Sequence, residues 1–159
     1  MLGGEALSQH AITSLSAVTK RIYDEYGPTE TTVGAMLAQV YPEVPSSGVS
    51  SPELSSYDTS SLVGDKGIGK PYANVKLYVL SQSLQLLPIG TPGELYIAGA
   101  GIAKGYLNRP ELSQDKFITN PFAEIEGEYA ILYKTGDKVR WQTDGNLIYL
   151  GRNDEQVKI

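Results

Sequence analysis

Short apolar runs separated by turn residues fill the second half of the chain, and this pattern is typical of β-strands. The dipeptide Asp144-Gly145 is a strong signal for a hairpin between the last two predicted strands. A TGD run at residues 135–137 is expected to form a turn between the predicted strands at 131–134 and 138–141. The predicted strands cover residues 75–80, 93–98, 131–134, 138–141 and 147–150.

Apolar residues recur at helical spacing over residues 7–20, where Ser8 can cap a helix. Residues 110–116 predict a second, short helix, with Asn108 as its cap and Pro110 in its first turn. Two further strands are expected at residues 21–24 and 31–40.

The composition changes between these regions. Residues 42–62 hold eight serines and three prolines. Such a segment cannot bury enough apolar area to offset the entropy lost on ordering it. We therefore expect a mobile surface loop at residues 42–65, and a boundary between two structural units.

Composition excludes several classes of function. The 159 residues suit one ordinary domain or two small ones, and 41% of them are hydrophobic. A net charge of −5 argues against a nucleic-acid partner, and the lack of a long apolar run argues against a membrane span. With no Cys and a single His, thiol chemistry, a multi-His metal site and a Ser-His-Asp hydrolase are not expected. These features suit a cytoplasmic protein.

Two glycine-rich runs resemble nucleotide-binding motifs, but each departs from its motif at a required position. GDKGIGK at residues 64–70 nearly matches a P-loop, but Pro71 stands where the motif needs a hydroxyl for Mg²⁺. GAGIAKG at residues 99–105 has its third glycine one place late, and no long helix follows. The glycines of the first run are expected to lead into a strand.

The run YGPTETT at residues 26–32 concentrates groups that handle nucleotides. Gly27 allows close approach of the backbone to a ligand, and Pro28 stiffens the turn. Its three threonines can donate to phosphate oxygens, while Glu30 is a hard oxygen ligand suited to Mg²⁺. A plain surface turn between two strands is the competing interpretation of the run, and a packed core aromatic is the separate alternative for Tyr26.

Four further sequence motifs follow this run along the chain. Together they closely resemble the adenylation domains of nonribosomal peptide synthetases, in the adenylate-forming superfamily that includes acyl-CoA synthetases and luciferases. The resemblance implies an α+β, mostly β fold: the end of an α/β, flavodoxin-like subdomain followed by a distorted β-barrel subdomain. The runs are YGPTETT at 26–32, GELYI at 93–97, GYLNRPE at 105–111, YKTGD at 133–137 and GRNDEQVK at 151–158.

The resemblance also implies an internal fragment, because the family's phosphate loop and catalytic lysine have no counterpart in the chain. We expect the fragment alone to be inactive. Residues 1–41 would end the α/β subdomain and residues 42–65 would form the Ser/Pro-rich loop. Residues 66–152 would form the β-barrel subdomain, and residues 153–159 would begin the hinge to a further domain.

In such domains an amino-acid carboxylate attacks the α-phosphate of ATP in the presence of Mg²⁺, giving an aminoacyl adenylate and pyrophosphate. The acyl group then moves to the phosphopantetheine thiol of a peptidyl carrier protein, among neighbouring synthetase domains. Catalysis rests on positioning and charge neutralisation, which suits a chain without Cys and with one His.

Roles follow from the resemblance, position by position. Tyr26 would stack on adenine, and Asp24 would lie beside the adenine amino group, where the family usually has Asn. Gly4, Glu5 and Ala6 would line the other side of the base.

Polar residues would hold the rest of the nucleotide. Thr29 would bond the α-phosphate and Glu30 would hold Mg²⁺. Asp137 would take both ribose hydroxyls, because a carboxylate offers two acceptor oxygens. Arg152 would add positive charge beside them.

Two residues near the chain end would serve the second half-reaction. Asp154 would be the hinge residue and Lys158 the lysine of the thioester-forming state. Asp137, Arg152 and Lys158 also have plain alternatives as a turn former and surface charges, and Glu94 is expected to be structural.

The side-chain pocket of the family falls partly in this chain. The pattern Gly3, Glu25, Val33, Gly34 resembles that of asparagine-activating domains, so the resemblance implies asparagine as substrate. The chemistry agrees, because Glu25 could accept a hydrogen bond from a carboxamide and the two glycines would leave room beside it. The aligned positions are Met1, Gly3, Glu25, Val33 and Gly34. An acyl-CoA or aryl-acid ligase of the same superfamily and a non-catalytic β interaction module remain the alternatives.

Overall fold

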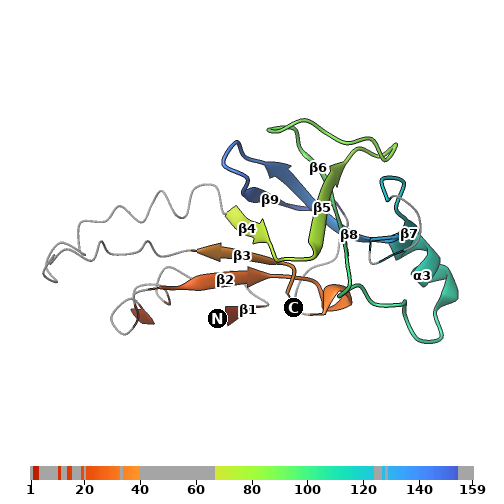
Figure 1. Cartoon of the computed structure of the whole chain (residues 1–159), viewed down its shortest axis with the longest axis horizontal. Coiled ribbons are helices and arrows are strands. Elements are labelled where there is room, and N and C mark those ends of the chain that lie inside the picture. The colour runs from red at the N-terminus through yellow and green to blue at the C-terminus, as the bar shows by residue number, and fades with distance from the viewer. Residues whose placement is uncertain are drawn as a thin grey trace, which may run out of the picture.

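The computed structural model describes residues 2–3, 11, 14–15, 19, 21–32, 34–39, 67–123, 127 and 129–153. Within these residues, nine strands pair into one continuous sheet, and the helix α3 (Pro110–Lys116) lies beside it (Figure 1). The architecture is mostly β and antiparallel, as the sequence predicts.

The order of strands in the sheet is β1-β2-β3-β4-β9-β8-β6-β5, and β7 pairs with β8 off this path. Only the β1–β2 pair is parallel among the described pairs. The strands are β1 (Leu2–Gly3), β2 (Tyr23–Tyr26), β3 (Met36–Gln39), β4 (Gly67–Pro71), β5 (Val75–Leu80), β6 (Gly93–Gly99), β7 (Phe117–Thr119), β8 (Ile131–Trp141) and β9 (Leu147–Arg152).

Strand β6 lies at the centre of the core because both of its faces are buried. Successive side chains of a strand point to opposite faces of the sheet. Leu95 and Ile97 therefore join one apolar cluster, which also holds Met36 of β3. Tyr96 and Ala98 join a second cluster on the other face. The predicted strands at residues 75–80 and 93–98 are confirmed, with β6 one residue longer.

The expected turn at residues 135–137 is wrong. Strand β8 runs without a break from Ile131 to Trp141, and Asp137 pairs with Arg152 of β9 within it. Gly136 takes a φ of 78°, and the register shifts nearby, so the run bends the strand without ending it. The hairpin at Asp144-Gly145 is confirmed, and β9 extends two residues beyond its predicted end.

In the first part of the chain, β2 and β3 form an antiparallel pair and run side by side (Figure 1). Both strands start later than predicted. For β3 the reason is a 3-10 helix, η1 (Thr29–Thr31), which reaches into the expected strand at 31–40. Of the predicted helix at 7–20, Ala11, Ser14 and Leu15 are helical and Thr19 is not, while the other residues of this range lie outside the described ones. The predicted loop at 42–65 lies outside them as well.

The predicted helix at 110–116 is confirmed as α3 (Pro110–Lys116), which lies beside β7 at one end of the sheet (Figure 1). Asn108 is not its cap. The N-cap residue is Arg109, and Asn108 instead takes a left-handed φ of 56° in the preceding turn. No helix among the described residues is long and apolar enough to cross a membrane.

Gly69 marks the point where β4 exchanges one neighbour for another. Lys70 and Pro71 pair with β3, whereas Gly67 and Gly69 pair with β9 across a bulge. Gly69 has a φ of 94°, and a Cβ there would lie 2.1 Å from the carbonyl oxygen of Leu37. Strand β4 thus joins two parts of the sheet: β1, β2 and β3 on one side, and β9, β8, β6, β5 and β7 on the other. Only glycine fits this junction.

We predict that Gly69→Ala lowers the free energy of unfolding by about 2–4 kcal/mol, from the left-handed φ and the backbone clash together. Gly90→Ala is the matched control, since Gly90 has a φ of 86° with nothing within 4 Å of a new Cβ. That control should cost about 1 kcal/mol. Urea denaturation of the protein carrying this chain measures both, and equal losses would contradict the clash.

Candidate active site

The carboxylate of Asp137 lies at the meeting point of three strands. Asp137 is only 3% exposed, although it is charged. Arg152 of β9 donates from Nη1 to Asp137 Oδ1 at 3.0 Å and from Nη2 to the carbonyl oxygen of Thr135 at 3.3 Å. Tyr26, at the end of β2, donates its hydroxyl to Asp137 Oδ2. A buried carboxylate needs such partners to offset its desolvation.

The backbone around Asp137 is held by the neighbouring strand β6. Thr135 donates its hydroxyl to the carbonyl oxygen of Leu95 at 2.8 Å and accepts from the amide of Asp137 at 3.0 Å. The amide of Gly136 donates to Glu94 Oε1 at 3.2 Å. Glu94 therefore serves the backbone locally, as predicted.

Tyr26 is tied to the core as well as to Asp137. Its ring packs against the cluster that contains Met36. Burial, and then the charge and hydrogen bond of Asp137, raise the pKa of Tyr26 far above its ordinary value, so the hydroxyl stays protonated and donates. The interpretation of Tyr26 as a packed aromatic thus describes part of its environment.

Glu30 lies on η1, which is docked onto the segment after β6. The amide of Ala103 donates to the carbonyl oxygen of Glu30 at 2.8 Å, and Thr32 donates its hydroxyl to the carbonyl oxygen of Gly101 at 2.6 Å. The hydroxyl of Tyr106 donates to Glu30 Oε1 at 2.6 Å. Backbone and side chain of Glu30 are therefore both fixed by the segment between β6 and α3.

Tyr106 is itself anchored by α3. Its amide donates to the hydroxyl of Ser113 at 2.8 Å. The centroid of its ring lies 5.5 Å from that of the Phe117 ring, in an edge-to-face contact.

A second carboxylate, Glu25, lies one residue before Tyr26. Tyr72 donates its hydroxyl to Glu25 Oε1 at 2.7 Å. A Cβ on Gly34 would lie 1.9 Å from the same oxygen, so the carboxylate occupies the space beside this glycine. Gly3 of β1 pairs with Glu25 in register. Three of the predicted pocket positions are thus neighbours in the structure.

The structure brings the predicted residues together in two groups. Tyr26, Asp137 and Arg152 form one, and Gly3, Glu25 and Gly34 form the other. Asp24 precedes Glu25 on β2 and pairs with Leu2, while Thr29 is exposed on η1. Outside the described residues lie Met1, Gly4, Glu5, Ala6, Val33, Asp154 and Lys158.

Sequence reasoning missed Tyr72 and Tyr106, which contact the predicted carboxylates. A compositional signal existed: the chain has 11 Tyr but only 2 Phe. An excess of phenols over plain rings indicates that many aromatic positions need a hydrogen-bond donor. The pairing itself joins residues 47 and 76 positions apart, which no local pattern reveals.

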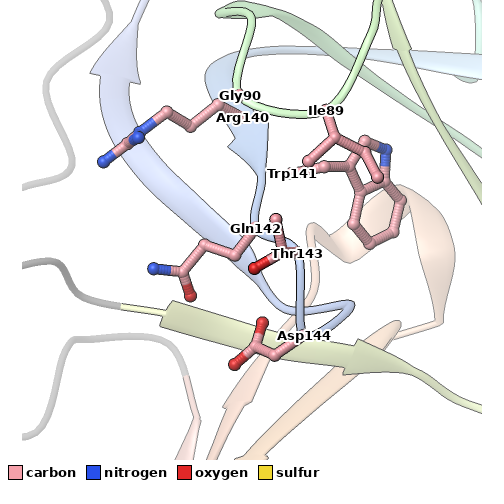
Figure 2. Close-up of a pocket in the computed structure, with 7 residues that line it drawn as sticks. All are labelled: Ile89, Gly90, Arg140, Trp141, Gln142, Thr143 and Asp144. Atoms are coloured by element: carbon pink, nitrogen blue, oxygen red, sulfur yellow. The ribbon is translucent and has the colours of Figure 1, made fainter.

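A surface pocket of about 400 Å³ lies away from both groups, at the β8–β9 hairpin (Figure 2). Trp141 and Ile89 lie on one side of it, and the side chains of Arg140 and Gln142 extend toward the other. It contains none of the predicted site residues.

The donor set suits a metal that arrives with a nucleotide. Within the described residues, no cluster of three or more His, Cys, Asp or Glu side chains could hold a metal ion. Mg²⁺ at phosphates usually needs one or two carboxylates, because phosphates and water supply the remaining ligands. Glu30 is such a carboxylate, held in place by Tyr106.

Comparison with known proteins identifies the family. The model of the AMP-binding enzyme family matches residues 1–107, and the chain belongs to this family. Among curated proteins, Gramicidin S synthase 2 of Brevibacillus brevis is 48% identical over 89% of the chain. Malpibaldin synthetase of Mortierella alpina is 44% identical over the whole chain. The chain spans about 3% of the length of each.

Solved structures give the same result for the fold. A four-domain nonribosomal peptide synthetase bound to AMP and glycine matches 99% of the chain with a TM-score of 0.71 and 38% identity, over 10% of its own length. An artificially fused adenylation–PCP di-domain from Klebsiella oxytoca matches 99% with a TM-score of 0.73 and 26% identity, over 26% of its length. The predicted fold class and the resemblance to adenylation domains are therefore confirmed.

We predict that Arg152→Met lowers the free energy of unfolding by about 3 kcal/mol, because it removes the cation from the buried Asp137 carboxylate. Arg109→Met is the control, since Arg109 is exposed and precedes α3. It should change stability by less than about 0.5 kcal/mol. Urea denaturation compares the two, and a similar small effect from both would show that the ion pair contributes little.

Proposed function

We propose that this chain forms the nucleotide-binding part of an amino-acid-activating adenylation domain. The reaction is amino acid plus ATP to aminoacyl-AMP plus pyrophosphate, followed by transfer to a carrier-protein phosphopantetheine thiol. The observation that carries this proposal is the convergence of Tyr26, Asp137 and Arg152 from three strands on one point. A plain turn or separate surface charges would not require it.

Asp137 is the ribose-binding group. Its two oxygens already accept from Tyr26 and Arg152, and each carboxylate oxygen has two acceptor sites. A ribose hydroxyl would add to these bonds or take the place of the Tyr26 hydroxyl. In the second case the Tyr26 ring is released toward the adenine, on which it would stack.

The phosphates would lie toward η1. Thr29 is exposed there and would donate to the α-phosphate, and Glu30 would hold Mg²⁺, which supplies positive charge to the phosphate oxygens. Arg152 adds a guanidinium near the ribose. These residues position the substrates and neutralise charge, so no side-chain nucleophile is needed.

The remaining roles rest on family resemblance. Gly4, Glu5, Ala6 and Asp24 would surround the adenine. Asp154 would be the hinge and Lys158 would act in thioester formation. Residues 1–41 would close the α/β subdomain and residues 66–152 would be the barrel subdomain, in a longer cytoplasmic synthetase that also carries a peptidyl carrier protein.

The amino acid that we propose is asparagine. Glu25 offers a carboxylate acceptor to a carboxamide, and Gly3 and Gly34 lie beside it. Met1 and Val33 would complete the lining. ATP–pyrophosphate exchange by the full-length protein with each amino acid tests the choice, and strong exchange with another amino acid but none with asparagine would reject it.

We predict that Asp137→Asn lowers AMP affinity about 10- to 100-fold, because hydrogen bonds to a charged acceptor contribute about 1.5–3 kcal/mol. Calorimetry on the full-length protein measures the affinity. Asp115→Asn is the control: Asp115 is exposed on α3 and should leave the affinity unchanged.

Equal AMP affinity of wild type and Asp137→Asn would favour a non-catalytic interaction module over a nucleotide site. A check of folding by thermal denaturation accompanies each variant, since Asp137 is buried.

A further inference from the structure

Tyr72 is held rigidly beside the residues of the proposed amino-acid pocket. It follows β4, and its amide donates to the carbonyl oxygen of Ala35 at 3.0 Å. Its own carbonyl oxygen accepts from the amide of Val75 at 3.2 Å. Both backbone groups of Tyr72 are therefore bonded, one of them to the residue next to Gly34.

This anchoring aims the Tyr72 side chain at Glu25. The hydroxyl donates to Glu25 Oε1 at 2.7 Å. Partial burial, together with the hydrogen bond and charge of Glu25, raises the pKa of Tyr72 to about 12. The phenol is therefore a neutral donor at physiological pH, and it occupies one oxygen of the carboxylate.

Gly34 is fitted to this pair. A Cβ at position 34 would lie 1.9 Å from Glu25 Oε1 and 3.0 Å from Cε2 of the Tyr72 ring. Any larger residue at this position would displace the carboxylate or the ring. Glycine at position 34 thus permits the hydrogen bond between Tyr72 and Glu25.

The second carboxylate oxygen, Glu25 Oε2, accepts no hydrogen bond from the part of the chain that the structure describes. Gly3, which pairs with Glu25 on β1, leaves no side chain beside it there. A fixed carboxylate with one satisfied oxygen presents the other oxygen to a ligand that can donate an N–H.

We propose that Tyr72 is a specificity-determining residue: by holding Oε1 of Glu25, it directs Oε2 toward an amino acid whose side chain ends in an N–H donor, such as a primary carboxamide. This inference rests on the proposed function. An acidic side chain would be repelled by Glu25. An apolar side chain of similar shape would leave the carboxylate desolvated and unpaired.

The test uses ATP–pyrophosphate exchange by the full-length protein that carries this chain, with asparagine, aspartate and leucine as substrates. Leucine resembles asparagine in shape but has no side-chain donor. Tyr72→Phe keeps the ring and removes the hydroxyl. We expect the kcat/KM ratio of asparagine to leucine to fall about 10-fold, with AMP affinity unchanged.

Tyr78→Phe is the matched control. Tyr78 lies on β5, outside the proposed pocket. Its hydroxyl accepts a hydrogen bond from Asn120 Nδ2 at 3.4 Å. Removing it should leave the ratio of asparagine to leucine unchanged.

Glu25→Gln gives a second and independent result. Tyr72 would still donate, now to the amide oxygen, and the amide nitrogen would face the substrate. The preference should then move from asparagine toward aspartate, whose carboxylate accepts the new donor.

The outcomes separate the two proposals. If Glu25→Gln changes the substrate ratios but Tyr72→Phe does not, the role of Tyr72 is rejected and the adenylating activity stands. A wild-type preference for leucine over asparagine also rejects it. If no amino acid supports exchange in the wild-type protein, the proposed function fails and this inference fails with it.

Discussion

The structure depends on one buried carboxylate. Asp137 lies in the middle of β8 and holds Tyr26 of β2 and Arg152 of β9, so three strands from both parts of the sheet meet at one charge. Such a group is costly to bury and strongly destabilising when a partner is lost. The same carboxylate is the group that we assign to the ribose, so the interaction that joins the parts of the sheet also builds the proposed site.

Pairs of a tyrosine hydroxyl and a carboxylate recur among the described residues. Tyr26 donates to Asp137, Tyr72 to Glu25 and Tyr106 to Glu30. In these three pairs, the phenol orients an acidic side chain that we assign to a ligand: ribose, amino acid or Mg²⁺. A fourth pair, Tyr96 with Glu94 at 3.5 Å, involves a carboxylate that serves the backbone. A phenol suits this task because its ring packs in an apolar environment while its hydroxyl orients an acceptor without adding charge. Pre-orientation of this kind is what a mechanism based on positioning requires.

Much of the β architecture could be predicted from the sequence, because apolar runs and turn signals are local. The strands at 75–80 and 93–98, the helix at 110–116 and the hairpin at Asp144-Gly145 are confirmed. The continuity of β8 could not be predicted, since a TGD run is typical of a turn, whereas the pairing of β8 with β6 on both sides of Gly136, and with β9 after it, keeps the strand continuous. Contacts of Tyr72 and Tyr106 depend on tertiary structure alone. The roles of Tyr26 and Asp137 came from family resemblance, and that of Glu30 from its oxygen-ligand chemistry and the resemblance together; all three stay predictions.

A crystal structure of the full-length protein with AMP tests the central claim most directly. The account predicts ribose hydroxyls within hydrogen-bonding distance of Asp137, the adenine stacked on Tyr26 and the phosphate near Thr29. AMP bound elsewhere, for example in the pocket beside Trp141, with Asp137 still enclosed by Tyr26 and Arg152, would contradict it.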